Sequence, residues 1–253
     1  MAHGMAIESL DKKGNSCRIK SGPPKSEMEL IGSLEQILST LRHEISNSLN
    51  SLKITIDVLR ENYDLFDDGK RKDYLKRGSK ILARQQQLIE AMKSYSRFNV
   101  KEQKEISFPS FWEHFMKTAS DRLKDGNIKL VHHLETGPCR IIGNTIAINH
   151  VMMNILDNTI EAIEDIETPK MEIKALRRND SVIIVMKDNG NGIMERDILK
   201  IFIPLFTTKP GRMGMGLPIA RKLLSEMGGR VEIKSAFGKG TEARVWLKTV
   251  NSK

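Results

Sequence analysis

The chain has 253 residues, of which 29% are charged and 39% are hydrophobic. This composition is typical of a globular protein with room for one large domain or two modest ones. The apolar runs fall well short of the roughly 18 residues that indicate a membrane span. Cys17 and Cys139 have neither a Cys-x-x-Cys spacing nor a disulfide framework around them, which favours a reduced, cytoplasmic protein.

The formal net charge of +9 raises the question of a nucleic-acid partner. Because the basic residues are scattered and aromatic residues make up only 5%, a solvated basic surface explains the charge better than a nucleic-acid interface. One local cluster is suited to steering an acidic protein partner by charge. This basic cluster consists of Lys70, Arg71, Lys72, Lys76, Arg77 and Lys80.

Residues 1–26 carry Gly, Ser, Pro and Lys and show no apolar periodicity. The run Ser21-Gly22-Pro23-Pro24 is a strong breaker of regular structure. We therefore expect residues 1–26 to form a flexible tail.

Residues 27–99 predict a helical hairpin. Apolar residues recur at steps of three and four from Ser26 to about Tyr63, and again from Leu75 to Tyr95, with a turn signal at Asp67-Asp68-Gly69 between them. Two helices alone make a poor core, whereas two hairpins from two chains would bury both apolar stripes. The pattern therefore predicts a homodimer that joins its hairpins in a four-helix bundle.

Residues 100–253 predict an α+β domain, in which helices cover one face of a mixed sheet. Helical periodicity alternates here with short strand-like runs, and Gly228-Gly229 separates the last helix from a closing hairpin. The expected helices are 111–123, 145–166 and 217–227, and the expected strands are 128–134, 139–142, 171–175, 182–186, 231–235 and 241–247.

Asn154 and Asn158 lie four residues apart on one predicted helix, so they share a face. Their amide oxygens can bind or orient Mg²⁺ and its water without adding negative charge to an anionic site. Taken alone, the pair would be better explained as surface asparagines.

Glycine-rich segments follow in a fixed order. Asp188 ends a strand just before Gly190 and Gly192, where a carboxylate can accept a hydrogen bond from an exocyclic amine and the backbone can approach a base closely. Gly214 and Gly216 precede a helix, whose free N–H groups suit phosphates. The loop 206–211 and the segment 238–241 complete the set. Each segment alone also fits an ordinary turn, but together they predict an ATP pocket with a lid.

The predicted first helix carries His43, Glu44 and Asn47. A neutral imidazole can attack a γ-phosphoryl group, and the adjacent carboxylate can accept its ring proton or hold its tautomer. A zinc-protease motif is excluded, because it would need a second histidine where Asn47 stands. Without the nucleotide pocket, His43 would be interpreted as a surface histidine; with it, we predict a phosphoacceptor.

These motifs, spread over about residues 28–250, resemble a sensor histidine kinase of two-component systems. The hairpin resembles the dimerisation and histidine-phosphotransfer hairpin, and residues 100–253 resemble the ATP-binding domain shared with type II DNA topoisomerases and mismatch-repair ATPases. The segment 206–217 is most similar to the lid of nitrogen- and oxygen-responsive sensors.

The resemblance implies roles for the polar pocket residues. Asn158 would be the Mg²⁺ ligand, and Asn154 would contact phosphate and a metal-bound water. Asp188 would bind the adenine amine, with Thr241 at the same end of the pocket. The remaining implied pocket and lid residues are Gly190, Gly192, Ile193, Thr208, Lys209, Arg212, Gly214, Gly216 and Leu217.

The resemblance also implies a reaction and its partners. ATP would phosphorylate His43 with help from Glu44, and the phosphoryl group would pass to an aspartate on the receiver domain of a response regulator. Asn47 would orient the water that dephosphorylates the regulator. The signal would come from a separate sensor protein or from a sensor outside this sequence.

Asn154 stands where ATP-hydrolysing relatives have a glutamate base, which favours phosphoryl transfer over hydrolysis. Five other positions depart from the resembled kinase pattern. Ser48 replaces a usual proline, Arg212 a usual lid glycine, and Asn144 a common aspartate, and Ile203 and Leu205 replace a more usual glutamate and phenylalanine beside the lid. Two other functions remain open at this point: a regulator-binding scaffold biased towards dephosphorylation, and a serine/threonine-directed kinase of the same ATP fold.

Overall fold

The computed structural model describes residues 5–7, 17–21, 27–97, 100, 102–124, 128–209 and 212–250. By its internal contacts the chain divides into two units. The first comprises Met1–Glu29, Phe98–Phe202 and Gly216–Lys253, and the second comprises Leu30–Arg97 and Ile203–Met215. Within the described residues, none of the helices combines the length and the apolarity needed to cross a membrane.

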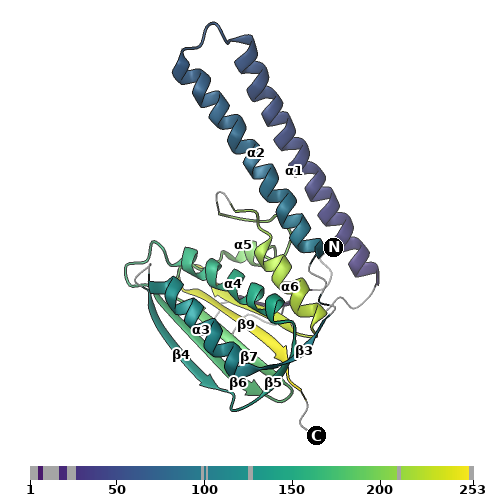
Figure 1. Cartoon of the computed structure of the whole chain (residues 1–253), viewed down its shortest axis with the longest axis vertical. Coiled ribbons are helices and arrows are strands. Elements are labelled where there is room, and N and C mark those ends of the chain that lie inside the picture. The colour runs from purple at the N-terminus through teal and green to yellow at the C-terminus, as the bar shows by residue number, and fades with distance from the viewer. Residues whose placement is uncertain are drawn as a thin grey trace. The chain divides into compact units, whose positions relative to one another are not determined.

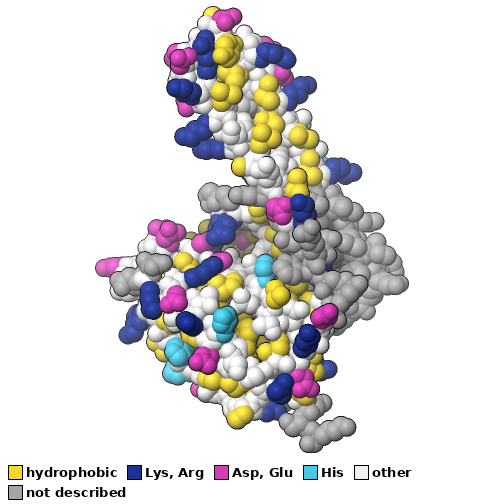
Figure 2. All heavy atoms as spheres, viewed as in Figure 1, with side chains coloured by type: hydrophobic (Ala, Val, Ile, Leu, Met, Phe, Trp, Pro, Cys, Tyr) yellow, Lys and Arg dark blue, Asp and Glu magenta, His cyan; other side chains and the backbone are white. Residues whose placement is uncertain are grey.

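The helical hairpin consists of α1 (Glu27–Glu61) and α2 (Asp68–Arg97) (Figure 1). The two helices pack closely where Gly78 faces Leu52, since a Cβ at position 78 would lie 3.6 Å from Leu52 Cδ1. Leu88 is buried, but large apolar side chains remain exposed along both helices (Figure 2). The structure thus contains both helices of the predicted hairpin, α1 and α2.

The turn of the hairpin is fixed by its own side chains. Asp67 Oδ1 accepts a hydrogen bond from the backbone N–H of Lys70 at 2.7 Å, which caps α2. The Arg71 guanidinium lies 4.3 Å from the centre of the Tyr63 ring and donates to the Tyr63 carbonyl oxygen at 2.8 Å. Because of this cap, α2 begins at Asp68, well before the first apolar residue of the predicted stripe.

The first unit is built on a seven-stranded mixed sheet of order β1-β2-β8-β9-β7-β6-β4. All neighbouring strands are antiparallel except β4 and β6, which are parallel. The strands are β1 (Met5–Ile7), β2 (Cys17–Ser21), β4 (Lys129–Glu135), β6 (Lys170–Arg178), β7 (Ser181–Asp188), β8 (Arg230–Ala236) and β9 (Gly240–Lys248). The closing hairpin that the sequence predicts is the antiparallel pair β8 and β9.

Three helices cover one face of this sheet (Figure 1). They are α3 (Phe108–Lys124), α4 (Thr145–Ala162) and α6 (Gly216–Glu226), and a short α5 spans Glu195–Ile198. Along most of β6 and β7 every second residue is buried, as expected for strands with one face against helices. Phe115, Met152 and Ile173 are fully buried. The predicted mixed helix-and-sheet fold is confirmed.

One pair of strands lies apart from the main sheet. β3 (Lys104–Ser107) pairs antiparallel with β5 (Arg140–Gly143) in a separate two-stranded sheet. The sequence predicts β5 but not β3, because the polar run before Phe108 has no alternating apolar pattern. β3 runs directly into α3, and the backbone N–H of Phe108 donates to the Cys139 carbonyl oxygen at 3.0 Å.

The expectation of a flexible tail over residues 1–26 is wrong for two segments. β1 pairs with β2, and β2 pairs with β8, with Ile19 opposite Ile233. The edge of β8 would otherwise offer unpaired N–H and C=O groups, and the N-terminal segment supplies partners for them. β2 is short and mostly polar and pairs with the distant β8, so local periodicity gives no signal for it. The rest of the predicted tail lies outside the described residues.

Candidate functional site

Helix α4 carries the predicted metal-binding asparagines. It begins after Asn144, whose side-chain oxygen accepts a hydrogen bond from the backbone N–H of Ala147 at 3.1 Å. Asn therefore serves as the cap in place of the Asp usual in the resembled pattern. Asn154 and Asn158 are half-buried and, at a spacing of four, lie on one face of α4.

Asn154 has a partner on its own helix. The side-chain amide nitrogen of Asn154 lies 3.0 Å from Nδ1 of His150, one turn earlier. Burial lowers the pKa of the His150 imidazole. Sequence reasoning assigned no role to His150, although its spacing of four from Asn154 is a signal that could have pointed to this contact.

Asp188, at the end of β7, is buried and held by several donors. Its Oδ1 accepts hydrogen bonds from the backbone N–H of Gly190 at 2.9 Å and of Thr241 at 3.0 Å. Its Oδ2 lies 3.4 Å from the hydroxyl of Thr159 on α4. These donors fix the carboxylate in one orientation, and two of the predicted residues, Asp188 and Thr241, are brought into direct contact.

The glycines around Asp188 are needed for close backbone approach. A Cβ at Gly190 would collide with the Ala162 carbonyl at the end of α4. Gly192 has a φ of +67°, and a Cβ there would collide with the Ala236 carbonyl. The loop after β7 is thereby pressed against both α4 and the end of β8.

A second polar network supports the same end of the site. The backbone N–H of Ile193 donates to the Ser235 hydroxyl at 2.9 Å, and that hydroxyl donates to the Gly240 carbonyl at 3.0 Å. The hydroxyls of Ser235 and Thr241 are 2.9 Å apart. Sequence reasoning missed Thr159 and Ser235, because an isolated Ser or Thr carries no motif.

Helix α6 brings the predicted phosphate-binding glycine to α4. Gly216 is the first residue of α6, and a Cβ there would lie 3.3 Å from Oδ1 of Asn154. The first N–H groups of a helix have no partner within it, so this end of α6 is suited to an anion. Leu217 follows in the same turn.

The predicted lid residues Thr208, Lys209, Arg212 and Gly214 belong to the second unit. The base of their loop is closed by a hydrogen bond of 3.2 Å from the Leu205 N–H to the Gly214 carbonyl. Gly214 has a φ of +65°, which a residue with a side chain rarely adopts. Pro210 and Gly211 lie outside the described residues.

His43, Glu44 and Asn47 lie within α1, as predicted, and His43 and Asn47 are exposed. Glu44 makes an ion pair with Arg84 on α2, at 3.5 Å between Oε2 and an Arg84 guanidinium nitrogen. Both side chains are well exposed, so the pair adds at most about 1 kcal/mol to stability and mainly orients the carboxylate. The sequence did not predict this partner, because it comes from 40 residues away.

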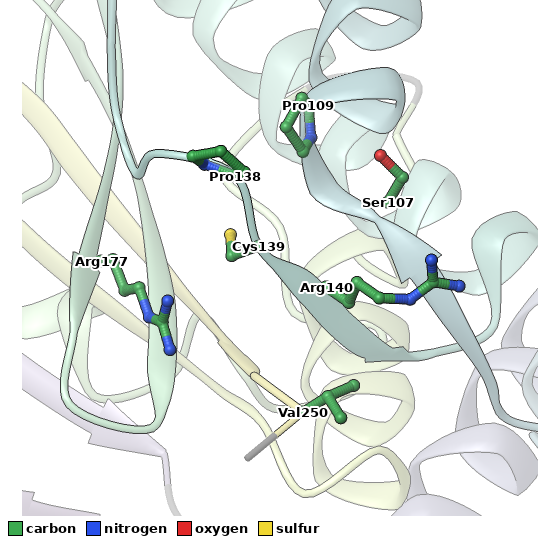
Figure 3. Close-up of a pocket in the computed structure, with 7 residues that line it drawn as sticks. All are labelled: Ser107, Pro109, Pro138, Cys139, Arg140, Arg177 and Val250. Atoms are coloured by element: carbon green, nitrogen blue, oxygen red, sulfur yellow. The ribbon is translucent and has the colours of Figure 1, made fainter. Parts of the chain in front are cut away.

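A cavity of about 330 Å³ lies elsewhere in the first unit. Figure 3 shows the Cys139 thiol between Pro138 and Arg140, with the Arg177 side chain reaching from the end of β6. None of its lining residues is a predicted site residue, and Arg140 is already paired with Glu105 at 2.9 Å. This cavity is therefore separate from the predicted nucleotide pocket.

The asparagine pair fits Mg²⁺ by its donor chemistry. Mg²⁺ prefers hard oxygen ligands, keeps several waters and usually takes one or two protein ligands together with substrate phosphates. Within the part of the chain that the structure describes, Asn154 Oδ1 makes no hydrogen bond, so this oxygen is available as an acceptor. In the same part of the chain, no three His, Cys, Asp or Glu side chains gather as a metal centre.

Comparison with known proteins identifies the domain that holds this site. Residues 143–251 match the family described as histidine kinase-, DNA gyrase B-, and HSP90-like ATPases. The chain is 26% identical over 212 residues to the methanogenesis regulatory histidine kinase FilI of Methanothrix harundinacea, covering 82% of this chain and 24% of FilI. It is 27% identical over 230 residues to sporulation kinase C of Bacillus subtilis, covering 87% of this chain and 50% of that kinase.

The fold is also that of a solved kinase. The structure of histidine kinase ThkA in complex with response regulator protein TrrA matches with a TM-score of 0.64 and 19% identity, covering 97% of this chain and 78% of that chain. This chain spans half or less of the length of FilI and sporulation kinase C. It is thus related to sensor histidine kinases, and its residues 143–251 form a histidine kinase-, DNA gyrase B-, and HSP90-like ATPase domain.

Proposed function

We propose that the chain is an ATP-dependent histidine kinase that phosphorylates its own His43 and passes the phosphoryl group to an aspartate of a response regulator. The observation that carries this proposal is that hydrogen bonds hold the Asp188 carboxylate in place beside helix α4, which bears the two asparagines. The same chain carries a His-Glu pair on the long helix α1. In this proposal residues 27–99 form the phosphotransfer hairpin and residues 100–253 the ATP-binding domain.

The adenine end is formed by Asp188 and Thr241. Oδ1 of Asp188 accepts from two backbone N–H groups and Oδ2 from the Thr159 hydroxyl, and we assign to Oδ2 the additional hydrogen bond from an exocyclic amine. The glycines at 190 and 192 let the backbone approach the base. Thr208, Lys209, Arg212 and Gly214 form the lid, with Ile193 and Leu217 lining the pocket.

The phosphate end is formed by α4 and the start of α6. Asn158 would hold Mg²⁺, and Asn154 would contact phosphate and a water on the metal. When bound, Mg²⁺ neutralises phosphate charge and so favours attack by a neutral nucleophile. Asn154 lacks the basicity to activate water, so the γ-phosphoryl group is preserved for His43.

At His43, a ring nitrogen forms a bond to the γ-phosphorus while the bond from phosphorus to the ADP oxygen breaks. The ring proton passes to Glu44, or Glu44 holds the tautomer that leaves the attacking nitrogen free. Arg84 keeps the Glu44 carboxylate oriented by their ion pair. Asn47, one turn further along α1, orients the water that dephosphorylates the regulator.

The hairpin forms a homodimer through its exposed apolar stripe. Large apolar side chains about half exposed recur at seven-residue intervals, at Leu49 and Ile56 on α1 and at Leu75, Leu82 and Ile89 on α2. A seven-residue repeat is the spacing of helices that supercoil around one another. A second copy of the hairpin covers both stripes in a four-helix bundle.

The chemistry is tested by incubating the chain with labelled ATP and Mg²⁺, beside His43→Gln. We expect alkali-stable, acid-labile label on the wild type and none on His43→Gln, because phosphohistidine is lost in acid. Equal labelling of both proteins, or acid-stable label, would contradict the assignment of His43. Nucleotide binding is measured in parallel, so that a variant that has lost its pocket is recognised.

A further inference from the structure

The contact between His150 and Asn154 fixes which atom of Asn154 faces the phosphate end. An amide nitrogen can only donate, so Nδ1 of His150 must accept the hydrogen bond at 3.0 Å. This contact requires the tautomer of His150 that carries its proton on Nε2.

The opposite end of the Asn154 amide is directed to α6. A Cβ at Gly216 would lie 3.3 Å from Oδ1 of Asn154, so the amide oxygen lies against the first residue of α6. If the amide turned over, its N–H groups would face this helix end and any metal-bound water there. Water bound to Mg²⁺ donates hydrogen bonds, so it is held by an acceptor and repelled by an N–H group.

We infer that His150 is a positioning residue, which holds the Asn154 amide with its oxygen towards the Mg²⁺·phosphate end of the ATP site. This inference rests on the proposed function, because it gives Asn154 the task of contacting a metal-bound water and phosphate. In this inference His150 acts on ATP and the metal only through Asn154. Residues that orient ligand-contacting groups typically change metal affinity or activity by about 10- to 100-fold when they are removed.

The test compares His150→Leu with His150→Gln. Leucine removes the acceptor, whereas glutamine keeps a side-chain oxygen that can accept from an asparagine one turn away. The affinity of the intact chain is measured for adenosine and, separately, for ATP with Mg²⁺, by calorimetry. We expect His150→Leu to weaken Mg²⁺·ATP binding about tenfold and to leave adenosine binding unchanged, with His150→Gln close to the wild type.

A double-mutant cycle separates positioning from packing. In an Asn154→Ala background, His150→Leu should cause no further loss, because the residue through which His150 acts is gone. His114→Leu, at an exposed histidine on α3, is the matched control and should bind as the wild type does. Equal loss of adenosine and Mg²⁺·ATP binding, a full additional loss in the Asn154→Ala background, or failure of His150→Gln to retain affinity would overturn the inference.

Nucleotide binding is measured without any phosphorylation step, so the two proposals can fail separately. Binding with the predicted pattern but without label on His43 would sustain the role of His150 and sink the kinase reaction. If His150→Leu kept the wild-type affinity for Mg²⁺·ATP while His43 was labelled normally, the role of His150 would be refuted and the kinase reaction would be sustained.

Discussion

At the scale of single residues, the hydrogen bonds around Asp188 determine in which direction its carboxylate can accept a further hydrogen bond. Two backbone N–H groups and the Thr159 hydroxyl approach it from three different elements, the loop after β7, β9 and α4. Oδ1 accepts two of these hydrogen bonds and Oδ2 accepts the third, so the carboxylate is held in one orientation. The residue is selective because its surroundings fix the direction in which it accepts a hydrogen bond.

We expect Asp188→Asn to abolish measurable ATP binding or to weaken it at least about tenfold. The oxygen of asparagine can take the place of Oδ1, but its N–H groups then face the exocyclic amine, so two donors oppose each other. The affinity for adenosine is the appropriate measurement. Asp180→Asn, at an exposed turn, is the control and should keep the wild-type affinity.

His150 predicts a dependence of stability on pH. Its pKa is lowered in the folded chain relative to its ordinary value of 6.5, so below about pH 6.5 the unfolded chain binds the proton more readily. The free energy of unfolding should therefore fall as the solution is acidified through this range. His150→Gln should show a shallower fall than the wild type in urea titrations between about pH 5 and 8, and parallel curves for the two proteins would refute the assignment.

Among the elements, the edge of β8 and the apolar stripe of the hairpin both need partners. The first is supplied within the chain by β2, and the second is supplied, in our proposal, by another copy. Both needs arise from the same rule, that polar backbone groups and apolar side chains are costly to leave uncovered.

We expect Ile19→Pro to destabilise the first unit, because proline cannot donate a hydrogen bond from the middle of β2. Each net hydrogen bond lost costs about 0.5–1.5 kcal/mol. Denaturation by urea, followed through the tryptophans on α3 and β9, measures this loss. Ile19→Val keeps the N–H group and should lose much less, so equal stability of the two variants would show that β2 adds little to the sheet.

The repeat on α2 makes a prediction about assembly. A charge at Leu82, midway between Leu75 and Ile89, would be buried without a partner in a four-helix bundle. We expect Leu82→Glu to convert the dimer to a monomer in light scattering. The matched control is Ala83→Glu, which places the same charge at the next exposed position of α2 and should leave the dimer intact. A wild type that is already monomeric would contradict the proposed bundle.

Over the molecule in general, the charge of +9 is spread widely, but the basic cluster lies at the start of α2. Arg71 donates a hydrogen bond to the Tyr63 carbonyl oxygen and forms an ion pair with Asp68. Lys76 and Arg77, by contrast, are exposed. An acidic receiver domain approaching the hairpin would be steered by such charges, mainly through its rate of association.

We expect the double substitution Lys76→Glu and Arg77→Glu to slow phosphotransfer to a receiver domain at low salt, with little effect on labelling of His43. The difference from the wild type should shrink as ionic strength rises, because salt screens exposed charges. Lys53→Glu, at an exposed lysine on α1, serves as the matched control. A loss of transfer that is independent of salt would point to a direct contact instead of steering.

Local patterns in the sequence were enough to predict most of the elements and the chemical inventory of this protein. Helical stripes, alternating strands and the order of glycine motifs involve only neighbouring residues, so the hairpin, β6, β7 and the closing β8–β9 pair could be predicted from them. Asp188 and the α4 asparagines were found in the same way, and their roles in ATP binding stay predictions.

The surroundings of those residues, by contrast, depend on how the chain folds. Thr159, Ser235 and Arg84 carry no motif, yet they contact Asp188, Thr241 and Glu44 because distant elements pack together. The same holds for β2, a short polar strand near the N-terminus that exists through its pairing with β8 near the other end of the chain. Local periodicity reports which face of an element is buried, but the partner across the interface depends on the whole fold.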